Sequence, residues 1–151
     1  MRVERVTPAH LAQIAELERL CFHAPWSERA LELLCGDTAT GFVALEGEAV
    51  VAYGGMLCVL DEGQITNVAT HPAHRRQGFA DAVLRALLRE AAARGLSFVT
   101  LEVRESNAPA IALYRRHGFA AVGRRPHFYK NPDEAALLLQ WNAPAVGTNG
   151  D

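Results

Sequence analysis

Two arginines and a glycine stand where an apolar stretch gives way to a helical pattern, and this arrangement predicts an anion-binding site. The apolar stretch covers residues 65–70, and the turn after it contains Arg75-Arg76-Gln77-Gly78-Phe79-Ala80. The first N–H groups of a helix have no partner inside the helix, and the helix dipole there favours negative charge. Gly78 lets the backbone approach a ligand closely, and the arginines add positive charge. These features suit a pyrophosphate, so the sequence predicts a nucleotide-like cofactor.

The same turn has a simpler interpretation, as an ordinary solvated connection between a strand and a helix. It has no Gly-Lys-Ser/Thr ending of the Walker type, and it lacks the three-glycine spacing of a dinucleotide-binding fingerprint. One glycine in an arginine-rich turn does not decide between the two interpretations, so the rest of the chain has to.

Two side chains further along could carry acid–base chemistry. Glu102 interrupts the apolar strand pattern of residues 98–103. Partial burial there would disfavour its charged form and make it a stronger base, although a solvated strand face is the simpler interpretation of the pattern alone. Tyr114 lies seven residues after Asn107, so the two share one helix face. On that pattern alone, Tyr114 is a core residue and Asn107 is a helix N-cap.

The elements that must position these residues begin with short segments of alternating strand and helix patterns. Thr7-Pro8 is typical of a helix start, as are Pro25-Trp26-Ser27 before the second helix. A turn at 46–48 joins two apolar runs and predicts a β-hairpin. The predicted elements are a strand at 2–6, helices at 7–21 and 27–34, and strands at 41–45, 49–60 and 64–70.

The second half of the chain alternates helix and strand. Gly95 and Gly118 end the two predicted helices, since glycine readily adopts the left-handed conformation at a helix C-terminus. The predicted elements are helices at 78–94 and 107–117 and strands at 98–103, 119–123 and 135–141. This order predicts an α+β (mixed α/β) fold: a central mixed, mostly antiparallel sheet of about seven strands flanked by about four helices. The ligand is expected at the strand ends around the crossover.

Length and composition indicate one globular domain at 1–141, followed by a tail at 142–151 that we expect to be disordered. The net charge of −2 does not suggest nucleic-acid binding. Three scattered cysteines and the absence of a signal peptide or of an apolar run of about 18 residues point to the cytoplasm and not to a membrane. We expect no metal, because His71 and His74 have no third ligand in view, and we expect a monomer or a weak dimer.

Several motifs together resemble the GNAT acetyltransferases. The run from Gln64 to Pro72, followed by Arg75-x-x-Gly78-x-Ala80, is similar to the acetyl-coenzyme A motif of that family. The runs Leu101-Glu102-Val103-Arg104-Glu105-Ser106-Asn107 and Ala110-Ile111-Ala112-Leu113-Tyr114, with Pro25-Trp26-Ser27, resemble a narrower group, the RimI-type N-terminal acetyltransferases of ribosomal proteins. The resemblance covers residues 2–141. Ala80 replaces a commoner glycine, and the region 124–132, near the peptide site in relatives, is shortened after Tyr129.

The resemblance implies a role for each candidate residue. Glu102 falls on the family's proton acceptor, and Tyr114 falls beside the coenzyme sulfur, where it would protonate the leaving thiolate. Asn107 would contact the pantetheine arm of acetyl-coenzyme A. A bulged strand would leave backbone groups free to pair with that arm, and the residues involved are Val68, Ala69 and Thr70. The pyrophosphate would lie against Arg75, Arg76, Gln77, Gly78, Phe79, Ala80 and Asp81, with the Phe79 side chain turned into the core.

By the same resemblance, the expected reaction is acetyl transfer from acetyl-coenzyme A to the N-terminal amine of a protein. The expected target is the N-terminal alanine of a bacterial small-subunit ribosomal protein. Two alternatives stay open at this point. One is an acetyltransferase for a small amine, such as a polyamine or an amino-sugar, which would use the same Glu102 and Tyr114. The other is a coenzyme-binding regulator without turnover, which the presence of both residues argues against.

Overall fold

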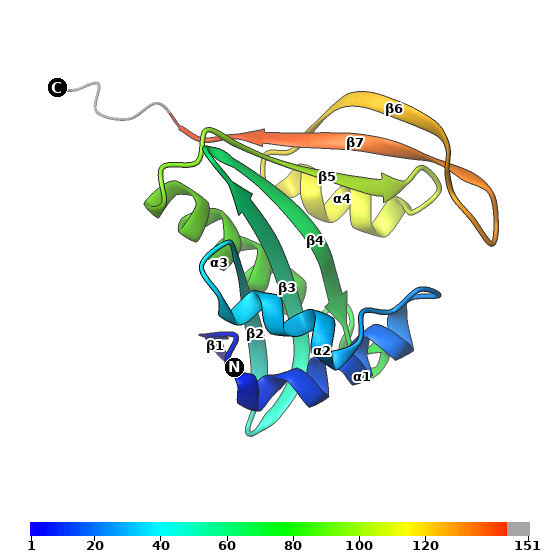
Figure 1. The fold of residues 1–151 in the computed structure, drawn as a ribbon. Coiled ribbons are helices and arrows are strands. Elements are labelled where there is room, and N and C mark those ends of the chain that lie inside the picture. Colours follow the sequence, from blue (N-terminus) through cyan, green and yellow to red (C-terminus); the bar gives the residue numbers. More distant parts are fainter. Residues whose placement is uncertain (145–151) are drawn as a thin grey trace, which may run out of the picture.

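The chain folds into one seven-stranded sheet covered by helices, as seen in a computed structural model that describes residues 1–144 (Figure 1). Four short 3-10 or α-helical segments and three longer helices accompany the strands. The elements are β1 (Arg2–Arg5), η1 (Pro8–His10), α1 (Leu11–Cys21), α2 (Glu28–Leu31), η2 (Glu32–Cys35), β2 (Ala39–Glu46), β3 (Ala49–Val59), β4 (Glu62–Thr70), η3 (Pro72–His74), α3 (Phe79–Ala93), β5 (Phe98–Arg104), α4 (Ala108–Arg116), β6 (Ala120–Tyr129) and β7 (Glu134–Asn142).

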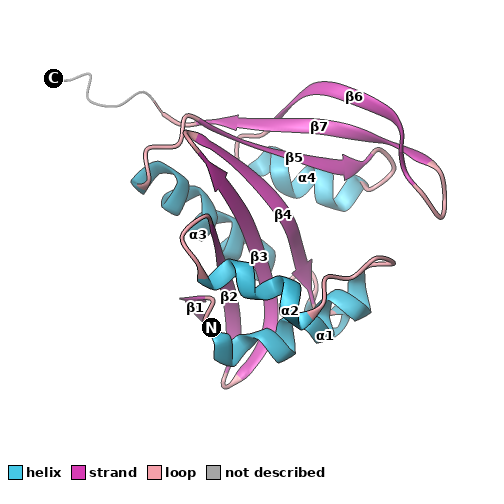
Figure 2. Ribbon diagram, in the orientation of Figure 1, coloured by secondary structure: helices cyan, strands magenta, loops and turns pink. Residues whose placement is uncertain are grey.

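The strand order in the sheet is β1-β2-β3-β4-β5-β7-β6. Among the strands of residues 1–144, only β4 and β5 pair in parallel, and α3 connects them as a crossover; all the other neighbours are antiparallel. Figure 2 shows the sheet as a strongly curved surface, with helices on both of its faces. The predicted fold class and the predicted order of elements are therefore confirmed.

Each face of the sheet has its own core. On one face, α1 and η2 pack on alternate residues of β2, among them Val43. On the other face, α3 packs on the intervening residues, among them Ala44, and buried residues of α4 belong to the same core. This division follows from the strand geometry, because successive side chains point to opposite faces. Within residues 1–144, no helix is both long enough and apolar enough to cross a membrane.

The helix ends follow the sequence signals. The Ser27 side chain accepts a hydrogen bond from the Ala30 N–H at 3.1 Å at the start of α2. Gly95 has φ +76° after α3, and the N–H of Leu96 donates to the Ala91 carbonyl at 3.0 Å. A residue with a side chain is strained in that conformation, which explains why glycine closes this helix. Both predicted caps are confirmed.

The sheet opens between β4 and β5. Their pairing covers only Glu62–Gln64 of β4 against Phe98–Thr100 of β5. Beyond these residues the two strands diverge (Figure 1). On its other side β4 shifts register against β3, since Gly54 pairs with Val68 but Met56 pairs with Ile65. The extra residue of β4 is a bulge at 66–67, as predicted, and the strand bends away from β5 there.

Two elements differ from the sequence prediction. Strand β6 continues to Tyr129, six residues beyond the predicted end at Gly123. It is an edge strand whose side chains are almost all exposed, so the sequence there lacks an apolar alternation. Pro126 is tolerated because an edge strand has one side without ladder hydrogen bonds. The second predicted helix is divided into α2 and the 3-10 segment η2. The predicted tail begins at the last residue of β7, and residues 145–151 lie outside the described residues.

The Glu90 carboxylate joins α3 to the first strand. It accepts two hydrogen bonds from Arg5, at 2.8 and 3.1 Å, and one from Arg94 at 2.8 Å. The hydrogen bond from Arg5, with further help from Arg94, lowers the pKa of Glu90 from 4.5 to about 2 against the opposing effect of burial. A lowered folded-state pKa stabilises the protein above the unfolded-state pKa, and this contribution is lost as the pH falls towards the folded-state value.

We therefore expect Glu90→Gln to lower the free energy of unfolding at pH 7 by about 1–2 kcal/mol, a value reduced for solvent screening of Arg5. Urea titrations at pH 7, 5 and 3 would show the difference from wild type shrinking between pH 5 and 3. Glu16→Gln is the control, because Glu16 makes only an exposed ion pair with Arg19. A difference that is the same at every pH would contradict the assignment.

Candidate active site

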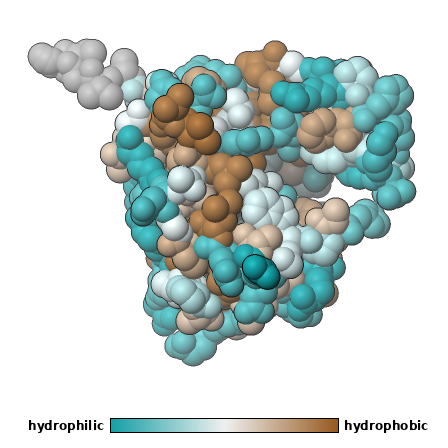
Figure 3. Space-filling model, in the orientation of Figure 1, coloured by the Kyte–Doolittle hydropathy of each residue, from teal (hydrophilic) through white to brown (hydrophobic). Residues whose placement is uncertain are grey.

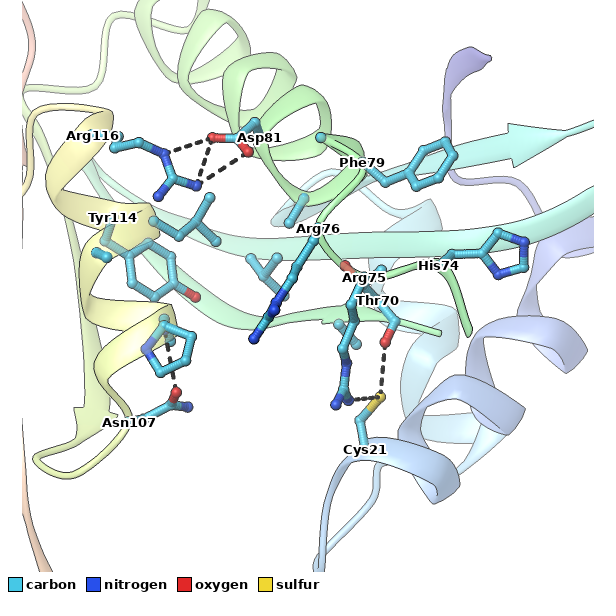
Figure 4. A pocket seen from close by; sticks show the side chains of 18 of the residues that line it. Cys21, Thr70, His74, Arg75, Arg76, Phe79, Asp81, Asn107, Tyr114 and Arg116 are labelled. Atoms are coloured by element: carbon cyan, nitrogen blue, oxygen red, sulfur yellow. Dashed lines mark hydrogen bonds and ion pairs between the residues drawn. The ribbon is translucent and has the colours of Figure 1, made fainter. Parts of the chain in front are cut away.

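The opening between β4 and α4 holds a cavity of about 590 Å³ (Figure 4). All the predicted coenzyme-binding residues except Gln77 line it, together with Tyr114. Glu102 lies outside this cavity. The lining residues are Cys21, Phe22, Val68, Ala69, Thr70, His74, Arg75, Arg76, Gly78, Phe79, Ala80, Asp81, Asn107, Pro109, Ala110, Ala112, Leu113, Tyr114 and Arg116.

The loop before α3 has the backbone of an anion site. Arg76 has φ +64° and Gly78 has φ +85°, both in the left-handed region. The first helical hydrogen bond of α3 runs from the Ala82 N–H to the Gly78 carbonyl, so the N–H groups before Ala82 have no helical acceptor. Figure 4 shows the Arg76 side chain extending into the cavity, whereas Phe79 points away from it into the core. The loop thus presents free donors and positive charge to the cavity.

Asp81 brings a carboxylate into this first turn, but other residues pair with it. It accepts hydrogen bonds from Arg116 at 3.2 Å, and one of its oxygens lies 2.8 Å from Nε2 of His117. Burial raises the pKa of Asp81, but the hydrogen bonds from His117 and Arg116 outweigh it and the net pKa is lowered. Asp81 therefore ties α4 to α3 and holds Arg116 at the cavity wall. The sequence analysis missed Arg116, because a pairing between two helices leaves no local pattern.

Helix α4 supplies the opposite wall. The side-chain oxygen of Asn107 accepts a hydrogen bond from the Ala110 N–H at 3.2 Å, which leaves its NH₂ group facing the cavity. Two turns later, the Tyr114 ring packs against Phe119 with centroids 5.5 Å apart. Its hydroxyl points into the cavity (Figure 4). Burial, and secondarily Tyr129, raise the pKa of Tyr114 above its ordinary value, so the phenol keeps its proton at neutral pH.

A second cavity, of about 290 Å³, contains Glu102. One Glu102 oxygen accepts a hydrogen bond from Nε2 of Gln64 at 3.4 Å, and the other lies 3.8 Å from Arg125. Its side chain is 17% exposed. The remaining lining is mostly apolar and aromatic: Trp26, Leu57, Gln64, Ile65, Thr66, Asn67, Phe128 and Tyr129. We call the projecting hairpin of β6 and β7 the β6–β7 arm. Figure 3 shows that this face of the molecule is hollowed between the β6–β7 arm and the part that carries α1 and α2.

The β4 bulge separates the two cavities. Asn67 lines the cavity that contains Glu102, and the next residue, Val68, lines the larger cavity. A molecule in each cavity would therefore meet the other at this point of the strand. One side offers backbone and cationic donors, and the other offers a carboxylate between apolar walls. This arrangement suits transfer of an acyl group between an anionic carrier and an amine.

Besides Arg116, other residues that line these cavities were missing from the predicted site, among them Gln64, Cys21 and Phe22. Gln64 belongs to the recognised motif but was not given a role, although its position in the strand puts it beside Glu102. Cys21 and Phe22 reach the larger cavity from the end of α1, and no local pattern connects them with β4. Among the described residues, no group of three histidine, cysteine or acidic side chains is arranged to hold a metal.

Comparisons with known proteins agree with this geometry. The sequence model of the Acetyltransferase (GNAT) family matches residues 11–119. The [ribosomal protein bS18]-alanine N-acetyltransferase of Haemophilus ducreyi is 32% identical over 140 residues, which are 91% of this chain and 97% of the relative. The Escherichia coli K12 enzyme of the same name is 35% identical, over 82% of this chain and 84% of the relative.

The fold comparison gives the same result. A crystal structure of the ribosomal-protein-S18-alanine N-acetyltransferase from Escherichia coli matches with a TM-score of 0.88 and 30% identity, covering 98% of this chain and 97% of that one. Because the family model covers most of the chain and these relatives match over most of their length, the chain belongs to the GNAT family of acetyltransferases, which use acetyl-coenzyme A.

Proposed function

We propose that this enzyme transfers the acetyl group of acetyl-coenzyme A to the N-terminal amine of a protein. The proposed acceptor is the N-terminal alanine of ribosomal protein bS18, the substrate in the names of the similar enzymes, which would place the reaction in the cytoplasm. The observation that carries the proposal is the position of Glu102 in a separate cavity that adjoins the coenzyme cavity at the β4 bulge.

The larger cavity takes the coenzyme in this proposal. The backbone of residues 68–70 has no β5 partner and is free to pair with the amides of the pantetheine arm, as an added strand would. The NH₂ group of Asn107 donates to the same arm. The pyrophosphate lies at the N-terminus of α3, where the loop N–H groups converge with Arg75 and Arg76. Gln77, whose side chain does not line the cavity, contributes through the loop backbone.

The reaction then needs two proton transfers. The acceptor nitrogen loses a proton to Glu102, directly or through a water, as its lone pair attacks the acetyl carbonyl. The backbone N–H near Val68 polarises that carbonyl. The carbon–sulfur bond breaks, and the leaving thiolate takes a proton from the Tyr114 hydroxyl, which its buried ring holds in the neutral form. The amide and free coenzyme A leave. Glu102 then releases its proton to water, and Tyr114 takes a proton from water.

The choice of an α-amine over a lysine follows from the cost of deprotonation. An α-amino group with a pKa near ~7.7–8.0 loses its proton at pH 7 for about 1 kcal/mol, whereas a lysine near ~10.4 costs about 4–5 kcal/mol. A single carboxylate such as Glu102 is therefore a sufficient base for an N-terminus. A cavity of about 290 Å³ with aromatic walls also suits a small first residue.

Changing Gly78 tests the coenzyme assignment. An alanine at φ +85° is strained by about 1–2 kcal/mol, and the loop relieves the strain by turning its N–H groups away from the pyrophosphate. We expect Gly78→Ala to raise the Kd for acetyl-coenzyme A by about fivefold or more in calorimetric titrations. Gly36→Ala is the matched control, because Gly36 has φ −99° and lies outside both cavities. Equal effects of the two substitutions would contradict the assignment.

Changing Glu102 tests the base and the acceptor together. Coenzyme release is measured with short peptides starting with Ala, Ser, Met or Gly, an internal-lysine peptide and spermidine. We expect turnover on the Ala-starting peptide, with a kcat that falls about 10²-fold in Glu102→Gln because the amine loses its general base. Glu105→Gln is the control, since Glu105 pairs with Arg124 and lies outside both cavities.

Two results would overturn parts of this proposal. Turnover on spermidine alone would replace the peptide with a small-amine acceptor and leave the acetyltransferase intact. Turnover on the Ala-starting peptide that is equal in Glu102→Gln and wild type would remove Glu102 from the role of base.

Changing Tyr114 tests the proton donor. We expect Tyr114→Phe to lower kcat by about 10- to 100-fold, because the thiolate leaves without a positioned proton. The Kd for acetyl-coenzyme A should stay within about twofold, since the ring still packs on Phe119. A matching loss of coenzyme affinity would instead indicate that the hydroxyl serves binding.

A further inference from the structure

Helix α1 carries a fully buried carboxylate that the proposed chemistry does not use. Glu18 is 0% exposed, among the apolar residues between α1 and the sheet. It accepts hydrogen bonds from the Trp26 N–H at 2.9 Å, from Nδ2 of Asn67 at 2.9 Å and from the Tyr53 hydroxyl. A buried charge is costly unless its partners are held in place, so these three donors are strongly constrained by it.

Two of the three donors form walls of the acceptor cavity. Trp26 lies in the segment between α1 and α2, and Asn67 lies in the β4 bulge; both line the cavity that contains Glu102. The same two elements also reach the coenzyme cavity, through Phe22 and Val68. Glu18 thus holds together the two segments that divide the coenzyme from the acceptor.

The third donor, Tyr53, binds the Glu18 carboxylate from the sheet. Tyr53 is 1% exposed on β3 and lines neither cavity. Burial and the neighbouring Glu18 charge raise the pKa of Tyr53, so its hydroxyl stays protonated and donates. Tyr53 therefore fixes Glu18 relative to the sheet, and Glu18 fixes the two cavity walls.

We propose that Glu18 is a positioning residue that sets the width of the acceptor cavity by holding Asn67 of the bulge and the Trp26 backbone on one carboxylate. It acts on the acceptor side without touching the reacting atoms. The inference rests on the proposed use of that cavity for the acceptor amine.

The test separates positioning from general stability. Glu18→Ala removes all three hydrogen bonds, and we expect it to raise the acceptor KM about tenfold or more while the Kd for acetyl-coenzyme A stays within about twofold. Glu18→Gln keeps the shape of the side chain but replaces one accepting oxygen with an NH₂ donor, so it should raise the acceptor KM several-fold, less than Glu18→Ala does. Thr40→Val is the control, because Thr40 is a buried polar residue outside the Glu18 network that accepts a hydrogen bond from Arg5 and lines neither cavity. Thr40→Val removes that hydrogen bond and should leave the acceptor KM within about twofold. Equal KM changes in Glu18→Ala and Thr40→Val would overturn the proposal.

A double-mutant cycle keeps the proposal testable if Glu18→Ala fails to fold. Glu18→Gln, Asn67→Ala and the double variant are compared by acceptor kcat/KM. If Glu18 acts through Asn67, the effect of Glu18→Gln shrinks by several-fold once Asn67 is truncated. Additive effects would overturn the proposal. The acceptor is whichever amine wild type uses best, so a failure of peptide acetylation counts against the proposed function and not against Glu18.

Discussion

The short pairing of β4 with β5 is the constraint on which the site depends. Parallel strands normally satisfy their backbone groups along their length, yet here the pairing stops after Gln64 and Thr100. The bulge at 66–67 bends β4 away, and its free backbone groups become part of a cavity wall. The crossover helix α3 begins beside this gap and brings its free N–H groups to the same place. One interruption of the sheet thus creates both the larger cavity and the donors that line it.

The sequence predicted most of the lining of the larger cavity, because this lining comes from contiguous runs of residues. The turn at Arg75–Asp81 and the helix that Asn107 caps carry local signals, namely glycine, capping residues and helical spacing. These signals can be read from the sequence without knowledge of the fold. The other side was harder to predict. The second cavity is lined by residues from β3, β4, β5, the α1–α2 segment and the exposed strand β6. Long-range pairs such as Glu18 with Asn67 leave no periodic pattern, and the extent of β6 was missed because its exposed side chains do not alternate.

The two cavities draw on different parts of the chain. Phe128 and Tyr129 on the β6–β7 arm and Trp26 before α2 line only the acceptor cavity, whereas the arginine-rich loop lines only the coenzyme cavity. In the proposed mechanism, substitutions in the first group change the acceptor site and leave the coenzyme site unaltered.

Strand β6 has a consequence for the behaviour of the enzyme at high concentration. Within residues 1–144 it pairs only with β7, so its outer edge carries backbone groups that another chain's strand could join. Arg124, Arg125 and Pro126 stand in this edge, and two register shifts twist it. Positive charge, a residue without an N–H group and local irregularity all oppose strand addition. Strand β6, which contributes Phe128 and Tyr129 to the second cavity, therefore opposes the joining of neighbouring molecules into an extended β-sheet.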